Sequence, residues 1–277
     1  MGGRKPTSLD IAQLAGVSQS TVSRALRDSP QVTAETRERI QAIARELNYQ
    51  VDHVASSLRS GQTRTLALLL FEDAVSDESN INPFFLSIMG SIARACAARD
   101  YDLLLSFQNL SEDWYRRYEE AHRADGLILL GYGDYTRSRG VLQRLADAGA
   151  HFVLWGPLVE GQPGASVGCD NHTGGLIATR HLLATGRRRV GFIGTASDHA
   201  PEFRARYLGY QQAHREAGHE CPPSLQVNAE SSETEGSRAI ADLLQRDPAL
   251  DAVFCASDLL AIGAANHLRE RGIDVPD

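Results

Sequence analysis

From Thr65 onward the sequence alternates short apolar segments with longer amphipathic ones, and this alternation is the feature that most restricts the fold. The short segments have the length of buried strands, whereas the longer ones carry apolar residues at the spacing of helices. A strand, a helix and a second strand form a right-handed βαβ unit in which the two strands lie parallel. This part of the chain is therefore predicted to be α/β, with parallel sheets.

The predicted elements occupy most of the chain after the first sixty or so residues. Strands are expected at residues 65–71, 101–107, 125–130, 151–155, 190–193 and 252–255. Helices are expected at residues 83–99, 111–123, 136–148, 172–185, 203–217, 233–245 and 258–271. Residues 156–164 are rich in glycine and proline, which favour loops. They are the predicted boundary between two α/β lobes, with a ligand cleft between the lobes.

The residues before this region predict three short helices. Thr7 followed by Asp10 is a capping-box pattern, Gly16 ends the first helix, Ser18 caps the second, and Thr33 precedes the third. The stretch DIAQLAGVSQSTVSRAL has small residues where two helices would cross, a glycine for the turn and an apolar residue inside the second helix. These are the requirements of a helix-turn-helix, whose second helix lies in the DNA major groove.

Charge is distributed unevenly along the chain. The net charge is −7, but residues 1–64 hold nine Lys and Arg against six Asp and Glu, while the remainder is acidic. A mildly basic head on an acidic body is compatible with a small DNA-contacting module joined to a body that does not bind DNA.

The compartment is expected to be the cytoplasm. The N-terminal sequence MGGRKPTSLD has no apolar core of a signal peptide, and no apolar run approaches the length of a membrane span. The four cysteines form no C-x-x-C pair, as expected for ordinary thiols in a reducing environment. A lone G-x-G at residues 131–133 lacks the rest of a dinucleotide-binding motif, so no enzyme is predicted. Cofactors, metal sites and catalytic residues are not expected.

Several of these segments carry a family resemblance. TSLDIAQLAGVSQSTVSRAL, then Asn48-Tyr49 and VASSLRSG at residues 54–61, resemble the headpiece and hinge of the lactose and galactose repressor (LacI/GalR) family of bacterial transcription regulators. The similarity continues in order through NPFF, YDLLL, DGLIL, VGCDN, GFIG, RYLGY and ASD, at residues 82–85, 101–105, 125–129, 167–171, 191–194, 206–210 and 256–258. It covers essentially the whole chain.

The resemblance implies the domain organisation. An all-α helix-turn-helix headpiece (1–51) and a hinge helix with linker (52–64) are expected to precede a periplasmic-binding-protein-like effector domain. That domain has a first lobe at 65–157 and a second at 158–277. Family members continue into another strand, an acidic pocket motif and segments that return to the first lobe, so the chain is expected to be a fragment or a truncated gene product.

The resemblance also implies DNA contacts. Gln19, Ser20 and Arg24 fall where the family reads bases; Arg can fork onto guanine, and Gln can pair with adenine. Hydroxyl side chains suited to phosphate oxygens are Thr7, Ser18, Thr21 and Ser23, for which capping and solvation are the alternative roles.

The hinge helix at residues 52–59 is expected to enter the minor groove. Leu58 resembles the family's wedge between two base pairs, and Ala55 suits a close approach to the partner's helix. Arg59 is expected to be a phosphate contact or a solvated charge rather than a base reader. Packing of Leu58 against the partner subunit is the alternative. Many members have Pro-Asn before this helix, whereas Val51-Asp52 stands here, so the hinge is expected to order less readily.

Six residues near predicted strand ends are expected to line the ligand cleft: Phe84, Phe85, Trp155, Arg206, Ser257 and Asp258. Aromatic faces and forked polar groups suit a sugar, although such aromatic residues are also common in cores. Ser257 is the expected ligand contact of its pair, and Asp258 the expected helix cap.

Together these features predict a transcription repressor that binds a pseudo-palindromic operator in double-stranded DNA as a homodimer. A small ligand, expected to be a sugar, would control it from the cleft. The alternative is a solute (sugar) binding protein without a regulatory role, since periplasmic sugar binders share the two-lobe fold.

Overall fold

The computed structural model describes residues 6–49, 62–71, 83–108, 118, 123–131 and 134–276. The chain divides into two compact units between Thr63 and Arg64. Within the described part of the chain, no helix combines the length and apolarity that crossing a bilayer requires.

The first unit holds the helices α1 (Ser8–Ala15), α2 (Gln19–Ala25) and α3 (Ala34–Glu46). Asp10 accepts a hydrogen bond of 2.7 Å from the Thr7 backbone N–H, and the Ser18 hydroxyl accepts one from the N–H of Thr21 at 3.2 Å. Gly16 ends α1 with a φ of 66°, a left-handed conformation that favours glycine. The buried side chains of this unit form one core: Ile11, Ala12, Ala15, Val22, Ala25, Val32, Ile40 and Ala44. The predicted three-helix arrangement is confirmed.

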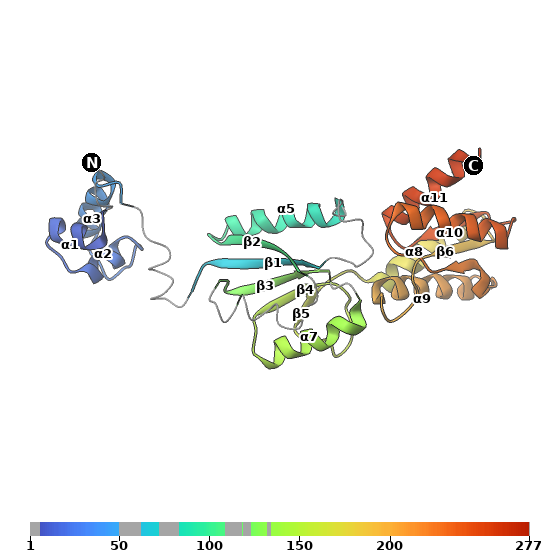
Figure 1. The fold of residues 1–277 in the computed structure, drawn as a ribbon, viewed down its shortest axis with the longest axis horizontal. Coiled ribbons are helices and arrows are strands. Elements are labelled where there is room, and N and C mark those ends of the chain that lie inside the picture. The colour runs from blue at the N-terminus through green and yellow to red at the C-terminus, as the bar shows by residue number, and fades with distance from the viewer. Residues whose placement is uncertain are drawn as a thin grey trace. The chain divides into compact units, whose positions relative to one another are not determined.

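The second unit begins with a five-stranded parallel sheet in the order β2-β1-β3-β4-β5. Its strands are β1 (Thr65–Phe71), β2 (Asp102–Gln108), β3 (Gly126–Leu130), β4 (Phe152–Trp155) and β5 (Ala165–Val167). Successive residues of β1 face opposite sides, so Ala67 and Leu69 pack in one core and Leu68 and Leu70 in another. Helix α7 (Tyr135–Asp147) covers the first face and α5 (Pro83–Ala97) the second (Figure 1).

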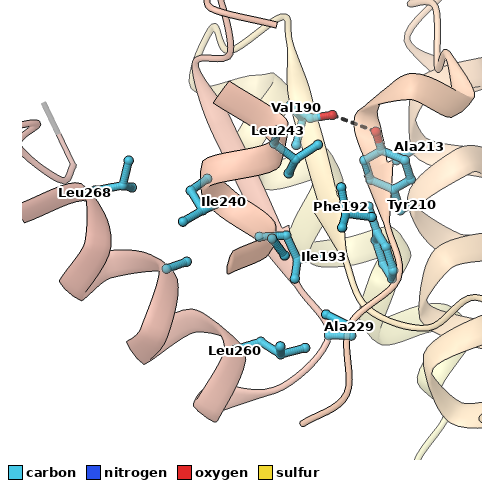
Figure 2. Close-up of a cluster of buried hydrophobic side chains, with 14 of the residues drawn as sticks. Val190, Phe192, Ile193, Tyr210, Ala213, Ala229, Ile240, Leu243, Leu260 and Leu268 are labelled. Carbon is cyan, nitrogen blue, oxygen red and sulfur yellow. Dashed lines mark hydrogen bonds between the residues drawn. The ribbon is translucent and has the colours of Figure 1, made fainter. Parts of the chain in front are cut away.

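A second parallel sheet has the order β7-β6-β8, with β6 (Val190–Ile193), β7 (Gln226–Val227) and β8 (Ala252–Cys255). Around it lie α8 (Asn171–Ala184), α9 (Pro201–Glu216), the short 3₁₀ helix η1 (Pro223–Leu225), α10 (Glu233–Arg246) and α11 (Asp258–Glu270). Figure 2 shows the core between sheet and helices, where Phe192 lies beside Tyr210. The Tyr210 hydroxyl donates a 2.6 Å hydrogen bond to the carbonyl of Val190, which satisfies the one polar atom of this buried ring.

Glycines allow the helices of this second lobe to cross closely. A Cβ at Gly175 of α8 would overlap the Arg206 carbonyl of α9, and a Cβ at Gly209 would overlap the His172 carbonyl of α8. The α10–α11 pair uses the same arrangement, with Gly263 against the Glu233 carbonyl. Each helix pair therefore approaches at a distance that no larger residue would permit.

The predicted strands and helices recur with ends shifted by one or two residues where the structure describes them, but β5 and β7 were not predicted. Both are too short to show an alternating pattern. Because β5 pairs with β4, residues 165–167 belong to the first sheet. These residues lie beyond the predicted lobe boundary at 157/158, which itself stays a prediction. The expected helix at 111–123 and the hinge helix at 52–59 lie largely or wholly outside the described residues.

The glycine crossing predicts opposite effects for two neighbouring substitutions in α8. Gly175→Ala should lower the free energy of unfolding by roughly 1–3 kcal/mol, because the backbones of α8 and α9 must move apart to make room for the added Cβ. Gly174→Ala is the matched control: a Cβ there meets nothing within 4 Å, so better helix propensity should raise stability by up to about 1 kcal/mol. Urea denaturation measures both, and equal effects would contradict the proposed close crossing.

Candidate functional site

Helix α2 presents a polar outer face and a buried inner one. Val22 and Ala25 are fully buried in the headpiece core, whereas Gln19, Ser20 and Arg24 are exposed. The helix therefore has the arrangement that a groove-reading helix needs, with its N-terminal residues accessible.

Hydroxyl groups form a small network at the N-terminus of α2. The Ser18 hydroxyl lies 2.8 Å from that of Ser20 and 2.9 Å from that of Thr21. At the start of α1, the Thr7 hydroxyl donates to Asp10 at 2.7 Å. Capping is thus an observed role of Ser18 and Thr7, and the exposure of Ser18 and Ser20 remains compatible with phosphate contact.

Two headpiece residues outside the predicted set also belong to this surface. The Gln19 side-chain amide donates to the Ser8 hydroxyl of α1 at 2.8 Å, which ties the tip of α2 to α1. Arg27 donates to the carbonyl of Ser23 at 3.2 Å and to its hydroxyl at 2.5 Å. The i,i+4 spacing of Ser23 and Arg27 was the available sequence signal.

An aromatic pair lies at the carboxyl edge of the first sheet. Trp155 is the last residue of β4, and the ring of Phe84, in the first turn of α5, lies 6.0 Å from it between centroids. Phe84 is 49% exposed, so its ring has an accessible face. Phe85 and Trp155 both pack against the core that contains Leu68, and each is half-buried there. The structure thus brings all three predicted aromatic residues together, since the rings of Phe84 and Phe85 lie 5.5 Å apart between centroids, and Phe84 is the exposed member of the group.

Arg206 of α9 is held by groups from two other segments of the second lobe. Its Nε donates to the side-chain oxygen of Asn171 at 2.9 Å, and its Nη1 donates to the carbonyl of Ala256. Its guanidinium carbon lies 5.5 Å from the centre of the Phe203 ring, within cation–π range. Burial lowers the pKa of Arg206, while the charges of nearby acidic groups, Glu202 foremost, act in the opposite direction.

The cap of α11 is Ser257 and not Asp258. Ser257 is the N-cap of α11, and its hydroxyl accepts from the N–H of Leu260 at 3.5 Å and from the Ser231 hydroxyl at 2.8 Å. Asp258 is the exposed first residue of the helix. The prediction that Asp258 is the cap is therefore wrong, because a cap needs the extended backbone that Ser257 has, with φ −148° and ψ 164°.

Glu202 is a further acidic group of this region that was not predicted. It lies one turn before Arg206 on α9 and is half-buried. Burial raises the pKa of its carboxyl to about 7, against the opposing effects of its own backbone N–H and of Arg206. The i,i+4 spacing of Glu202 and Arg206 on one helix was the signal that could have identified it.

The segment before α9 contacts the N-terminus of α7. The carbonyl of His199 accepts from the N–H of Tyr135 at 3.1 Å, and its ring Nδ1 lies 2.9 Å from the carboxylate of Asp134, the N-cap of α7. Hydrogen bonds from Thr136 and His199 hold the pKa of Asp134 at about 2, against the effect of burial. This contact links residues that flank the two sheets.

The predicted DNA-contacting residues Ala55, Leu58 and Arg59 lie outside the described residues. The predicted ligand residues form an aromatic group at the first sheet and a polar group at the second. Among the described residues, no cluster of three or more His, Cys, Asp or Glu side chains could hold a metal ion.

Family models match both parts of the chain. "Bacterial regulatory proteins, lacI family" matches residues 7–52, and "Periplasmic binding proteins and sugar binding domain of LacI family" matches residues 74–277. The chain is 33% identical to the HTH-type transcriptional regulator CelR of Thermobifida fusca, over 99% of the chain and 80% of the relative. It is 31% identical to the ribose operon repressor of Escherichia coli K12, over 98% of the chain and 80% of that repressor.

Solved structures agree with this assignment. A transcriptional regulator CelR–cellobiose complex has a TM-score of 0.67 and 32% identity, over 98% of the chain and 80% of that structure. The lac repressor dimer bound to operator and the anti-inducer ONPF has a TM-score of 0.76, with the same shares covered and 22% identity, and supports the fold alone. The predicted fold class, a helical headpiece with a periplasmic-binding-protein-like domain, is confirmed.

The raised pKa of Glu202 predicts a pH-dependent stability difference. Between its ordinary pKa of 4.5 and about 7, the folded protein holds this proton more tightly than the unfolded chain, so rising pH costs stability. Glu202→Gln removes that cost. Relative to the parent, the variant should gain roughly 1–3 kcal/mol across this pH window and no more above it. Thermal or urea unfolding from pH 4.5 to 8 measures the difference, and parallel profiles would contradict burial of the carboxyl.

Proposed function

The chain belongs to the lacI family of bacterial regulatory proteins, and on that premise we propose how it represses transcription under the control of a sugar. It is a DNA-binding transcription regulator rather than an enzyme. One observation carries the proposal: a helix-turn-helix and a two-sheet ligand domain follow each other in one chain that aligns with regulators over 98–99% of its length. The rival function, a sugar-binding protein without a regulatory role, leaves the headpiece unexplained.

In the proposed complex, α2 lies in the major groove of operator DNA. Arg24 would fork onto guanine O6 and N7, and Gln19, steadied by Ser8, would pair with adenine. The hydroxyls of Thr7 at the start of α1, of Ser18 and Thr21 at the start of α2, and of Ser23 would contact phosphates. Two copies of the chain would present two headpieces to a pseudo-palindromic site. Leu58 would enter the minor groove between them, Ala55 would allow the two hinge helices to approach closely, and Arg59 would contact a phosphate. This work is proposed to take place in the cytoplasm, where the DNA is.

The proposed effector is a sugar. The Phe84–Trp155 pair offers aromatic faces for the C–H side of a sugar ring, and Arg206 offers donors for its hydroxyls. The relatives support this class, because one is named for the ribose operon and another is solved with cellobiose. Cellobiose is therefore the first ligand to test.

Control of DNA binding is proposed to pass through the arrangement of the lobes. A ligand that contacts both lobes stabilises one arrangement, and it shifts the equilibrium only by its difference in affinity for the two. The contact of His199 with Asp134 and Tyr135 joins segments that flank the two sheets. A change in the arrangement of the lobes would therefore alter this contact.

The function is tested by a gel shift on fragments of genomic DNA. The full chain should retain a subset of fragments at low salt, and cellobiose should change that retention. A fragment of residues 1–64 consists of the first compact unit, Met1–Thr63, and Arg64. It should bind DNA more weakly and with less selectivity than the full chain, because it lacks the lobes that form the dimer. If the full chain retains no DNA, the regulator function is wrong.

Base reading by Arg24 predicts a loss confined to specific DNA. Arg24→Ala should weaken operator binding by about 10- to 100-fold and binding to scrambled DNA far less. Arg39→Ala, which removes the same charge from an exposed position of α3, is the control. Fluorescence anisotropy on a retained fragment measures both, and equal losses would reduce the role of Arg24 to general electrostatics.

Ligand stacking by Trp155 predicts a separation of ligand response from DNA binding. Trp155→Ala should abolish the cellobiose response and leave DNA binding in place, whereas Trp155→Phe, which keeps an aromatic face, should retain part of the response. Titration of the DNA complex with cellobiose gives both results. A full response in the alanine variant would make Trp155 a core residue.

A further inference from the structure

Asn171, the first residue of α8, uses both ends of its side-chain amide within the second lobe. Its Oδ1 accepts from Nε of Arg206 at 2.9 Å, and its Nδ2 donates to the carbonyl of Cys169 at 3.1 Å. The residue is only 8% exposed. Asn171 is therefore a buried amide with both functions satisfied, one of them by the arginine proposed to bind the effector.

The guanidinium of Arg206 is consequently held at two of its three nitrogens. Nε is bonded to Asn171 and Nη1 to the carbonyl of Ala256, from the turn between β8 and α11. No acceptor within the described part of the chain is bonded to Nη2. A planar group held at two corners has little rotational freedom, so its third nitrogen is preorganised for a ligand.

The chemical type of the side chain at position 171 matters as much as its position, because it accepts the hydrogen bond from Arg206. A carboxylate at position 171 could accept the same hydrogen bond, but it would also pair with the positive charge of Arg206. An amide orients the guanidinium and leaves its charge available, and charge-assisted hydrogen bonds are roughly twice as strong as neutral ones. Glu202, whose charge also acts on Arg206, has its pKa raised to about 7 by burial, so it is only partly ionised near neutral pH.

We propose that Asn171 is the positioning residue for effector binding, which holds Arg206 so that Nη2 donates to a hydroxyl oxygen of the sugar without loss of the arginine's charge. This rests on the proposed function for the nature of the ligand, but not for the Asn171–Arg206 bond itself. A purely structural Asn171, needed only to start α8, would stabilise the lobe without affecting Arg206.

The first test needs no ligand. In the full chain, the Nε–Hε resonance of Arg206, assigned by its loss in Arg206→Lys, should exchange slowly with water. Asn171→Ala should speed this exchange about tenfold or more, since the acceptor is lost. Asn171→Asp, which keeps an acceptor, should retain slow exchange and also guards against a folding defect in the alanine variant. Unchanged exchange in Asn171→Ala would overturn the proposal.

The second test is a double-mutant cycle with cellobiose, measured by calorimetry. Asn171→Ala and Arg206→Lys should each weaken binding about tenfold, and the double variant should be little worse than either one, because both remove the same contact. Asn171→Asp should also bind less well, since it pairs with the arginine's charge. Additive losses, about a hundredfold in the double variant, would overturn the positioning role. If the parent does not bind cellobiose, the proposed effector is wrong, while the exchange measurement still decides the role of Asn171.

Discussion

The close crossing of α8 and α9 determines the geometry of the second lobe. With glycine on both helices at the crossing, backbone lies against backbone, and the start of α8 comes within hydrogen-bonding distance of Arg206. At the other ends of the two helices, Arg180 binds Glu216 through two nitrogens at 2.5 and 2.8 Å. The pair is thus tied at its crossing and at both sides of it. The position of Arg206, which is proposed to bind the ligand, is therefore set by the packing of α8 against α9 and not by a flexible loop.

The headpiece depends on a different and more local constraint. Its core is built from residues 11–49, so its fold is specified by sequence neighbours. This explains why the caps at Thr7 and Ser18 and the turn at Gly16 could be predicted from the residues. A unit with its own core can read DNA while the rest of the chain responds to a ligand, which is the division of work that the family membership implies.

Prediction from sequence succeeded where a pattern was long and failed where a contact was distant. The six longer strands and most helices carried clear periodicity, but β5 and β7 have three and two residues and form only because a neighbouring strand supplies hydrogen bonds. The greater exposure of Phe84 than of Phe85 depends on which ring faces the core, and the choice of Ser257 over Asp258 as the helix cap depends on one backbone turn. Asn171 was part of a recognised motif, yet its partner lies 35 residues away.

The glycine crossing also limits how this lobe could change its ligand over evolution. Gly175, Gly209, Gly236 and Gly263 meet backbone atoms, and no side-chain rearrangement can make room for a substitution there. Variation in this lobe is therefore confined to positions such as the helix starts, where Glu202 and Ser257 lie. A library built to redirect this regulator toward another small molecule should randomise those positions and leave the four glycines unchanged.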